Sequence, residues 1–87
     1  MRHYRYMTSG VCSRSITFGL EEGRLYDVMF EGGCNGNLKA VGKLVEGQDA
    51  AKIAATLRGN DCKGRGTSCA DQLARAIELA LVEEKKV

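Results

Sequence analysis

Residues 14–30, RSITFGLEEGRLYDVMF, contain two runs in which apolar and polar residues alternate, separated by EEG. Alternation with a period of two is typical of strands with one buried face, because successive side chains of a strand point to opposite faces of the sheet. The short polar connection between the runs therefore predicts a β-hairpin. The residues predicted to face the core are Ile16, Phe18, Leu20, Tyr26, Val28 and Phe30.

Upstream of the hairpin, residues 3–8, HYRYMT, alternate tyrosines with basic residues. Charged side chains are common on strands at the edge of a sheet, where they discourage further pairing. This segment predicts a third, edge strand that ends before Gly10 and Cys12. The N-terminal part of the chain is therefore expected to form an antiparallel sheet of two or three strands.

After Phe30 the pattern changes, because EGGCNGN breaks the strand and apolar residues then recur at helical spacing. The first helix is predicted to begin within residues 35–37 and to end at Gly47. Asp49 can cap a short second helix, which Gly59 terminates. The apolar residues on these two helices are Leu38, Val41, Leu44, Val45, Ile53, Ala54 and Leu57.

The last helix follows Ser68, with Asp71 three residues later in an approximate capping box. Its apolar stripe is formed by Leu73, Ile77, Ala80 and Leu81. Strands therefore come first and helices second, an order typical of α+β folds with helices on one face of an antiparallel sheet. We predict a single domain over residues 1–87 with about three C-terminal helices.

The composition is that of a folded globular domain, with 44% hydrophobic and 28% charged residues. The net charge of +2 and the absence of a run of like charges do not favour a nucleic-acid or membrane-surface protein. No segment has an apolar signal core or the roughly 20 apolar residues that span a bilayer. We therefore expect a cytoplasmic protein without a membrane partner; the sequence leaves its oligomeric state open, a homodimer included.

The four cysteines, Cys12, Cys34, Cys62 and Cys69, each fall at a junction between predicted elements rather than inside an apolar stripe. Two structural disulfides are disfavoured in a reducing compartment, so metal binding or redox chemistry gains weight. Loops and element ends can aim their side chains at a common site, as metal ligands must be aimed. The four thiolates could hold zinc or an iron–sulfur cluster. The alternative is four unrelated core or surface thiols.

Local charge at these junctions favours the thiolate form of cysteine that binds metal. Cys34 and Cys69 lie at predicted helix N-termini, where the helix dipole is positive, and Lys63 and Arg65 follow closely after Cys62. The spacing itself is a weak signal, because Cys62 and Cys69 are separated by six residues and common zinc sites use pairs separated by two to four. A metal site therefore requires that folding bring the four junctions together.

The segments GVCSRSITF, VMFEGGCNGNLKAVGKLVEG and TSCADQLARAI together resemble the TSCPD-domain family, named for a Thr-Ser-Cys-Pro-Asp motif. The likeness covers nearly the whole chain and includes all four cysteines. Ala70 replaces the proline of the motif, which removes a rigid first-turn residue but no metal ligand.

The resemblance implies an accessory role in ribonucleotide reduction. Domains of this family occur as C-terminal appendages of cobalamin-dependent ribonucleotide reductases, where their cysteines are proposed to bind metal. The resemblance thus implies a metal-binding accessory domain whose partner is ribonucleotide reductase or another redox protein. The label ribonucleoside-diphosphate reductase would apply only by association with that enzyme. A chain of 87 residues cannot contain the reductase barrel. Alone, the chain is not expected to be catalytic.

A fainter resemblance is to NifU/IscU-type iron–sulfur scaffolds. Cys12, Cys34 and Cys69 match the three scaffold cysteines in order, but Ser68 stands where the scaffolds have histidine, and Cys62 is the candidate replacement ligand. This resemblance implies a NifU/IscU-like fold and an alternative function in cluster assembly. A further alternative is thiol redox chemistry, in which Cys62 and Cys69 cycle between dithiol and disulfide.

Overall fold

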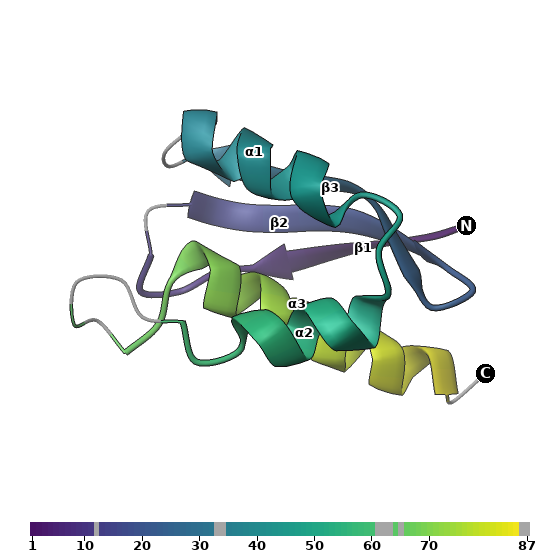
Figure 1. Cartoon of the computed structure of the whole chain (residues 1–87). Helices are drawn as coiled ribbons and strands as arrows, with labels where there is room; N and C mark the ends of the chain where they lie inside the picture. The colour runs from purple at the N-terminus through teal and green to yellow at the C-terminus, as the bar shows by residue number, and fades with distance from the viewer. Residues whose placement is uncertain (12, 33–34, 61–63, 65, 86–87) are drawn as a thin grey trace.

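The computed structural model describes residues 1–11, 13–32, 35–60, 64 and 66–85 (Figure 1). Three strands pair in the order β1-β2-β3, with both neighbouring pairs antiparallel, and three helices follow in the chain. This arrangement confirms the α+β fold and the third, edge strand. The elements are β1 (Arg2–Met7), β2 (Ser13–Glu21), β3 (Arg24–Gly32), α1 (Asn35–Val45), α2 (Ala50–Leu57) and α3 (Cys69–Lys85).

The helices pack on one face of the sheet, with α1 along β3 and with α2 against α3 (Figure 1). The centre of the core is formed by Ile16 and Phe18 of β2 together with Leu73 and Ile77 of α3, all fully buried or nearly so. These residues belong to the predicted apolar faces of the hairpin and of the last helix. Burial of these faces is the main force that holds the two layers together.

The register of β2 and β3 shifts in the middle of the hairpin. Thr17 pairs with Met29, whereas Gly19, two residues further along β2, pairs with Tyr26, three residues back along β3. The strand β3 therefore contains one extra residue, a β-bulge. Asp27, at this point, has a positive φ of 54°, a backbone conformation that aspartate tolerates better than most residues.

The bulge changes which residues of β3 face the core. Leu25 and Val28 are buried, whereas Tyr26 is only partly buried and lies outside the core cluster. The prediction that Tyr26 faces inward was therefore wrong, because it extended one alternation through a point where the strand gains a residue. Phe30, beyond the bulge, packs against the core as predicted.

The helix boundaries follow the predicted capping signals. The helix α1 begins at Asn35, and Gly47 beyond its end has a φ of 72°. Asp49 caps α2, since its carboxylate accepts a hydrogen bond of 3.1 Å from the backbone N–H of Lys52. Gly59 follows α2 with a φ of 85°, a conformation that glycine adopts without steric cost.

Only half of the predicted capping box forms at the start of α3. The hydroxyl of Ser68 accepts a hydrogen bond of 3.1 Å from the backbone N–H of Asp71, as an N-cap residue should. The carboxylate of Asp71 bonds to Gly59 and Thr67 instead of returning to the backbone N–H of Ser68. Asp71 thereby connects α3 to the chain that precedes it.

The helix α1 lies close against β3 at Gly42. A Cβ atom at this position would lie 2.7 Å from the carbonyl oxygen of Val28, well inside contact distance. We expect Gly42→Ala to lower the free energy of unfolding by about 2 kcal/mol, because α1 must move away from the sheet. Urea unfolding with Gly36→Ala as the control checks this, since a Cβ at Gly36 in the same helix meets no atom within 4 Å. Equal losses in both variants would show that close packing at Gly42 is not the cause.

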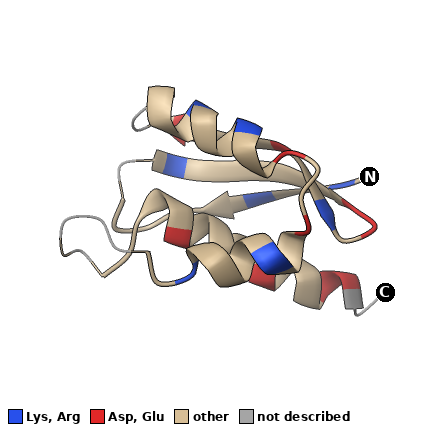
Figure 2. Cartoon of the chain, in the orientation of Figure 1, with Lys and Arg blue, Asp and Glu red and all other residues tan. Residues whose placement is uncertain are grey.

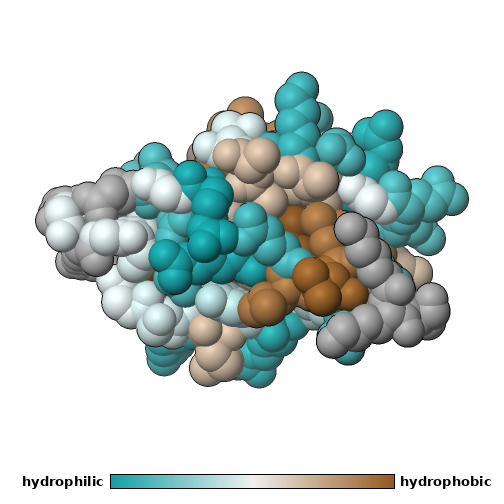
Figure 3. Space-filling view, turned by 90° about the horizontal axis from the view of Figure 1, so that it is seen from below, coloured by the Kyte–Doolittle hydropathy of each residue, from teal (hydrophilic) through white to brown (hydrophobic). Residues whose placement is uncertain are grey.

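The described surface combines scattered charge with exposed apolar side chains. Lys and Arg are interspersed with Asp and Glu over the strands and helices (Figure 2). Met7 and Met29 are more than half exposed on the sheet face opposite the helices, and Leu79 and Val82 are more than half exposed on α3. The face seen in Figure 3 carries an apolar patch within a mostly polar surface. None of the helices within the described residues has the length and apolar character needed to cross a bilayer.

Candidate metal centre

Cys69 is the first residue of α3, directly after the N-cap Ser68. The Ser68 hydroxyl accepts from the backbone N–H of Asp71, and the Ser68 carbonyl accepts from the backbone N–H of Gln72 at 2.8 Å. The first turn of the helix is thereby fixed. The sulfur of Cys69 is therefore carried by the N-terminus of α3.

The start of β2 lies against this helix start. The hydroxyl oxygen of Ser13 is 3.2 Å from the sulfur of Cys69, although 56 residues separate the two in the chain. Ser13 also pairs with Gly32 at the end of β3. Three segments that are distant in sequence therefore meet at Ser13: the start of β2, the end of β3 and the start of α3.

The segment after α2 joins the same region. The side-chain amide of Asn60 donates a hydrogen bond of 3.1 Å to the hydroxyl of Ser68. The neighbouring backbone N–H of Gly59 donates to the carboxylate of Asp71 at 2.6 Å. Two hydrogen bonds therefore connect the segment after α2 to the start of α3. Their acceptors, Ser68 and Asp71, lie on either side of Cys69 in the chain.

The connection between β1 and β2 is attached to α3 by a chain of polar contacts. The backbone N–H of Ser9 donates to the side-chain oxygen of Gln72 at 3.3 Å, and the amide of Gln72 donates to the hydroxyl of Thr67 at 3.0 Å. Thr67 and Gln72 are buried. Buried hydrogen-bonded groups of this kind favour one arrangement of the segments that carry them.

Asp71 is the centre of this polar network, with 0% of its surface exposed. Its carboxylate accepts from the hydroxyl of Thr67 at 2.6 Å, from the N–H of Gly59 at 2.6 Å and from the guanidinium of Arg75 at 2.9 Å. A second guanidinium, that of Arg58, lies 3.7 Å away. Burial alone would raise the pKa of Asp71, but these hydrogen bonds and the charge of Arg75 outweigh it and hold the pKa below its usual value.

Among the four predicted metal ligands, Cys69 is the one whose surroundings the structure describes. Cys12, Cys34 and Cys62 lie outside the described residues, as do the cations Lys63 and Arg65. Within residues 1–11, 13–32, 35–60, 64 and 66–85, no three His, Cys, Asp or Glu side chains are grouped as metal ligands. The described residues that flank each cysteine are therefore the ones that bear on the candidate centre.

Arg14 brings a positive charge to the junction between β2 and β3. Gly32 has a φ of 81°, and a Cβ built on it would be 3.5 Å from the Nε atom of Arg14. The guanidinium thus lies over the end of β3, two residues before Cys34 in the chain. A cation at this place favours negatively charged groups nearby.

Sequence reasoning did not find Ser13, Thr67 or Gln72, and it assigned Asp71 to the helix cap alone. One signal was present, because Asp71 and Arg75 are four residues apart and can pair on one helix face. The contact of Ser13 with Cys69 had no such signal, since it depends on how β2 packs against α3.

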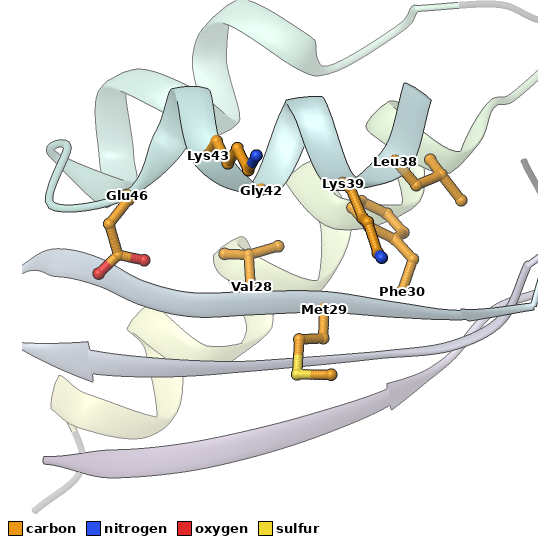
Figure 4. A pocket seen from close by; sticks show the side chains of 8 residues that line it. All are labelled: Val28, Met29, Phe30, Leu38, Lys39, Gly42, Lys43 and Glu46. Carbon is orange, nitrogen blue, oxygen red and sulfur yellow. The ribbon is translucent and has the colours of Figure 1, made fainter. Parts of the chain in front are cut away.

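Two hollows lie away from these junctions. The first, of about 440 Å³, lies between α1 and β3, with Val28, Phe30 and Leu38 on its apolar side (Figure 4). The second, of about 370 Å³, lies between β1 and α3 beside Tyr6 and Leu79. Neither is lined by the residues that surround Cys69. These two hollows are therefore distinct from the described surroundings of Cys69.

Comparison with known proteins gives one match. A family model described as the TSCPD domain matches residues 1–81 of this chain. No curated protein and no solved structure matches it. The match supports the first resemblance drawn from the sequence, and the fainter likeness to NifU/IscU-type scaffolds receives no support from these comparisons.

Proposed function

This chain belongs to the TSCPD-domain family, and from that premise we propose that it is a cysteine-ligated metal-binding domain that serves ribonucleotide reduction as an accessory. The proposed ligands are Cys12, Cys34, Cys62 and Cys69. Four thiolates fit zinc or an iron–sulfur cluster better than they fit Mg²⁺ or Ca²⁺, which take oxygen ligands.

One observation carries the proposal: a chain of contacts links described neighbours of all four cysteines. Ser13, which follows Cys12, lies beside Cys69 and pairs with Gly32, two residues before Cys34. Asn60, two residues before Cys62, bonds to Ser68, which precedes Cys69. The relevant contacts are Ser13 with Cys69, Ser13 with Gly32, and Asn60 with Ser68.

Chain geometry sets the scale of this argument. Each residue of an extended chain spans about 3.5 Å at most, so one or two residues reach no further than about 7 Å. Cys12, Cys34 and Cys62 are each one or two residues along the chain from a described residue of the cluster that contains Cys69. The metal, when bound, would crosslink these four junctions and so add to the stability of a small domain.

The polar residues around Cys69 have a structural part in this proposal. Asp71 fixes the segment after α2 and the start of α3, and Ser13 fixes the start of β2 against Cys69. Metal ligands are held in place by hydrogen-bonded neighbours in this manner in many proteins. The described segment around Cys69 would therefore be held in place before metal binds.

The accessory role in ribonucleotide reduction rests on family membership. The TSCPD resemblance implies ribonucleotide reductase, or another redox protein, as the partner. Binding to ribonucleotide reductase purified from the same host tests this role. We expect the metal-loaded form of this chain to bind the reductase and the same chain to bind more weakly after a chelator has removed its metal. Equal binding with and without metal would show that the metal site has no part in binding the reductase.

Metal content tests the site itself. Protein purified without oxygen is expected to contain about one equivalent of zinc or of a cluster, with its four thiols protected from a thiol reagent until the protein is unfolded. Iron with acid-labile sulfide would identify a cluster, and zinc alone would identify a single ion. Less than about a tenth of an equivalent of any metal, with all four thiols titratable in the folded protein, would refute the proposal.

A further inference from the structure

The hydroxyl of Ser13 is placed to bond the sulfur of Cys69. The two atoms are 3.2 Å apart, within hydrogen-bond distance for sulfur, and Ser13 is only 3% exposed. In the thiol form either group can donate the hydrogen. A sulfur that binds metal as thiolate carries no hydrogen, so the serine hydroxyl is then the donor.

We propose that Ser13 is a positioning residue that donates a hydrogen bond to the metal-bound sulfur of Cys69 and thereby tunes the metal site. This inference rests on the proposed function, because it requires that Cys69 bind the metal. Its consequence follows from charge: a donor to a thiolate withdraws electron density from the sulfur, so less density reaches the metal.

The backbone around Ser13 holds its hydroxyl in place. The hydroxyl of Thr8 donates to the carbonyl of Ser13 at 2.6 Å, and the backbone of Thr8 donates to the next carbonyl, that of Arg14, at 3.2 Å. On its other side Ser13 pairs with Gly32 of β3. With both flanks of β2 fixed, the backbone that carries this hydroxyl is held in place before metal binds.

Ser15 provides a matched control on the same strand. It is 1% exposed, and its hydroxyl donates to the carboxylate of Glu31 at 2.8 Å rather than to a sulfur. Removal of either hydroxyl deletes one part-buried hydrogen bond from β2. A general effect of weakening this strand would therefore appear in both variants, and an effect on the metal site would appear in Ser13→Ala alone.

Cobalt(II) is the probe, because its thiolate sites absorb light through charge transfer from sulfur to metal. In Ser13→Ala the sulfur of Cys69 becomes the better electron donor, so this band should move to lower energy than in wild type. Cobalt(II) affinity should fall by about tenfold, the lower range for loss of a group that supports a metal ligand. Ser15→Ala should keep the wild-type band and affinity.

A second pair of variants separates the hydroxyl from side-chain size. Ser13→Thr keeps the hydroxyl and Ser13→Val replaces it by a methyl group of similar volume, so both place the same extra bulk at this buried position. The band of the threonine variant should match that of wild type, and the valine variant should match Ser13→Ala. If Ser13→Ala does not fold, this pair decides the question.

The possible results are distinct. Identical spectra for wild type and Ser13→Ala, or the same shift in Ser15→Ala, would overturn the role of Ser13 while leaving the metal site intact. A wild-type protein that gives no sulfur-to-cobalt band would instead refute the proposed function, and with it this inference. A shift confined to the variants without the Ser13 hydroxyl supports both.

Discussion

Asp71→Ala is expected to lower the free energy of unfolding by about 3 kcal/mol, the largest effect we anticipate for one substitution outside the cysteines. The carboxylate is fully buried and accepts hydrogen bonds from Gly59, Thr67 and Arg75. Alanine leaves the buried hydroxyl of Thr67 and the N–H of Gly59 without this acceptor. Equilibrium unfolding in urea measures the loss.

The surface carboxylate of Glu78 is the control. It forms an ion pair with the guanidinium of Arg58, which also lies near Asp71, but it is about half exposed. Exposed ion pairs contribute less than about 1 kcal/mol, so Glu78→Ala should have a small effect. If Asp71→Ala were as mild as Glu78→Ala, the buried network would not hold α2 and α3 together.

The pKa of Asp71 adds a dependence on pH to this prediction. Because its pKa in the folded protein is lowered, the ionised carboxylate stabilises the fold at and above the ordinary aspartate pKa of about 3.9. That stabilisation is lost as the pH falls through the lower, folded pKa. Wild type should thus lose stability between about pH 4 and its acid transition more steeply than Asp71→Asn.

The second large effect concerns the cysteines. Replacing any one of Cys12, Cys34, Cys62 or Cys69 by serine should weaken zinc binding by about 100-fold or more, because loss of a group that merely supports a ligand already costs 10- to 100-fold. Serine has nearly the same size, so the fold without metal should change little. Competition with a chromophoric chelator measures the affinity.

The four serine variants also distinguish the alternatives. A single ion or cluster on four sulfurs predicts that each variant is impaired. A redox pair predicts instead that Cys62→Ser and Cys69→Ser alone abolish a disulfide and that Cys12→Ser behaves as wild type. Zinc affinity that is unchanged in all four variants would contradict the metal-binding proposal.

The sequence predicts the layers of this fold well, because they depend on local pattern. The alternation of Ile16, Phe18 and Leu20 and the helical stripe of Leu73 and Ile77 are visible in the chain, and all five residues are buried. The bulge in β3 is not visible, since it is defined by pairing with β2. Tyr26 was consequently assigned to the core in place of Leu25.

The candidate centre is predicted less fully for a related reason. Residue type and junction position identify the cysteines, but the contact between Ser13 and Cys69 joins residues 56 positions apart. Asp71 has the sequence signature of a cap residue, and its burial among Gly59 and Thr67 results from packing of α2 and α3. Such contacts depend on tertiary structure and cannot be inferred from spacing.

X-ray absorption at the zinc edge of the zinc-loaded protein tests most directly whether one ion gathers the four sulfurs. We predict a first shell of four sulfur atoms at about 2.3 Å, with no nitrogen or oxygen ligand. The Ser13→Ala variant should keep this shell, and Cys69→Ser should lose one sulfur from it. A wild-type shell dominated by nitrogen or oxygen at about 2.0 Å would contradict the account, because the junctions would then not deliver their thiolates to a common ion.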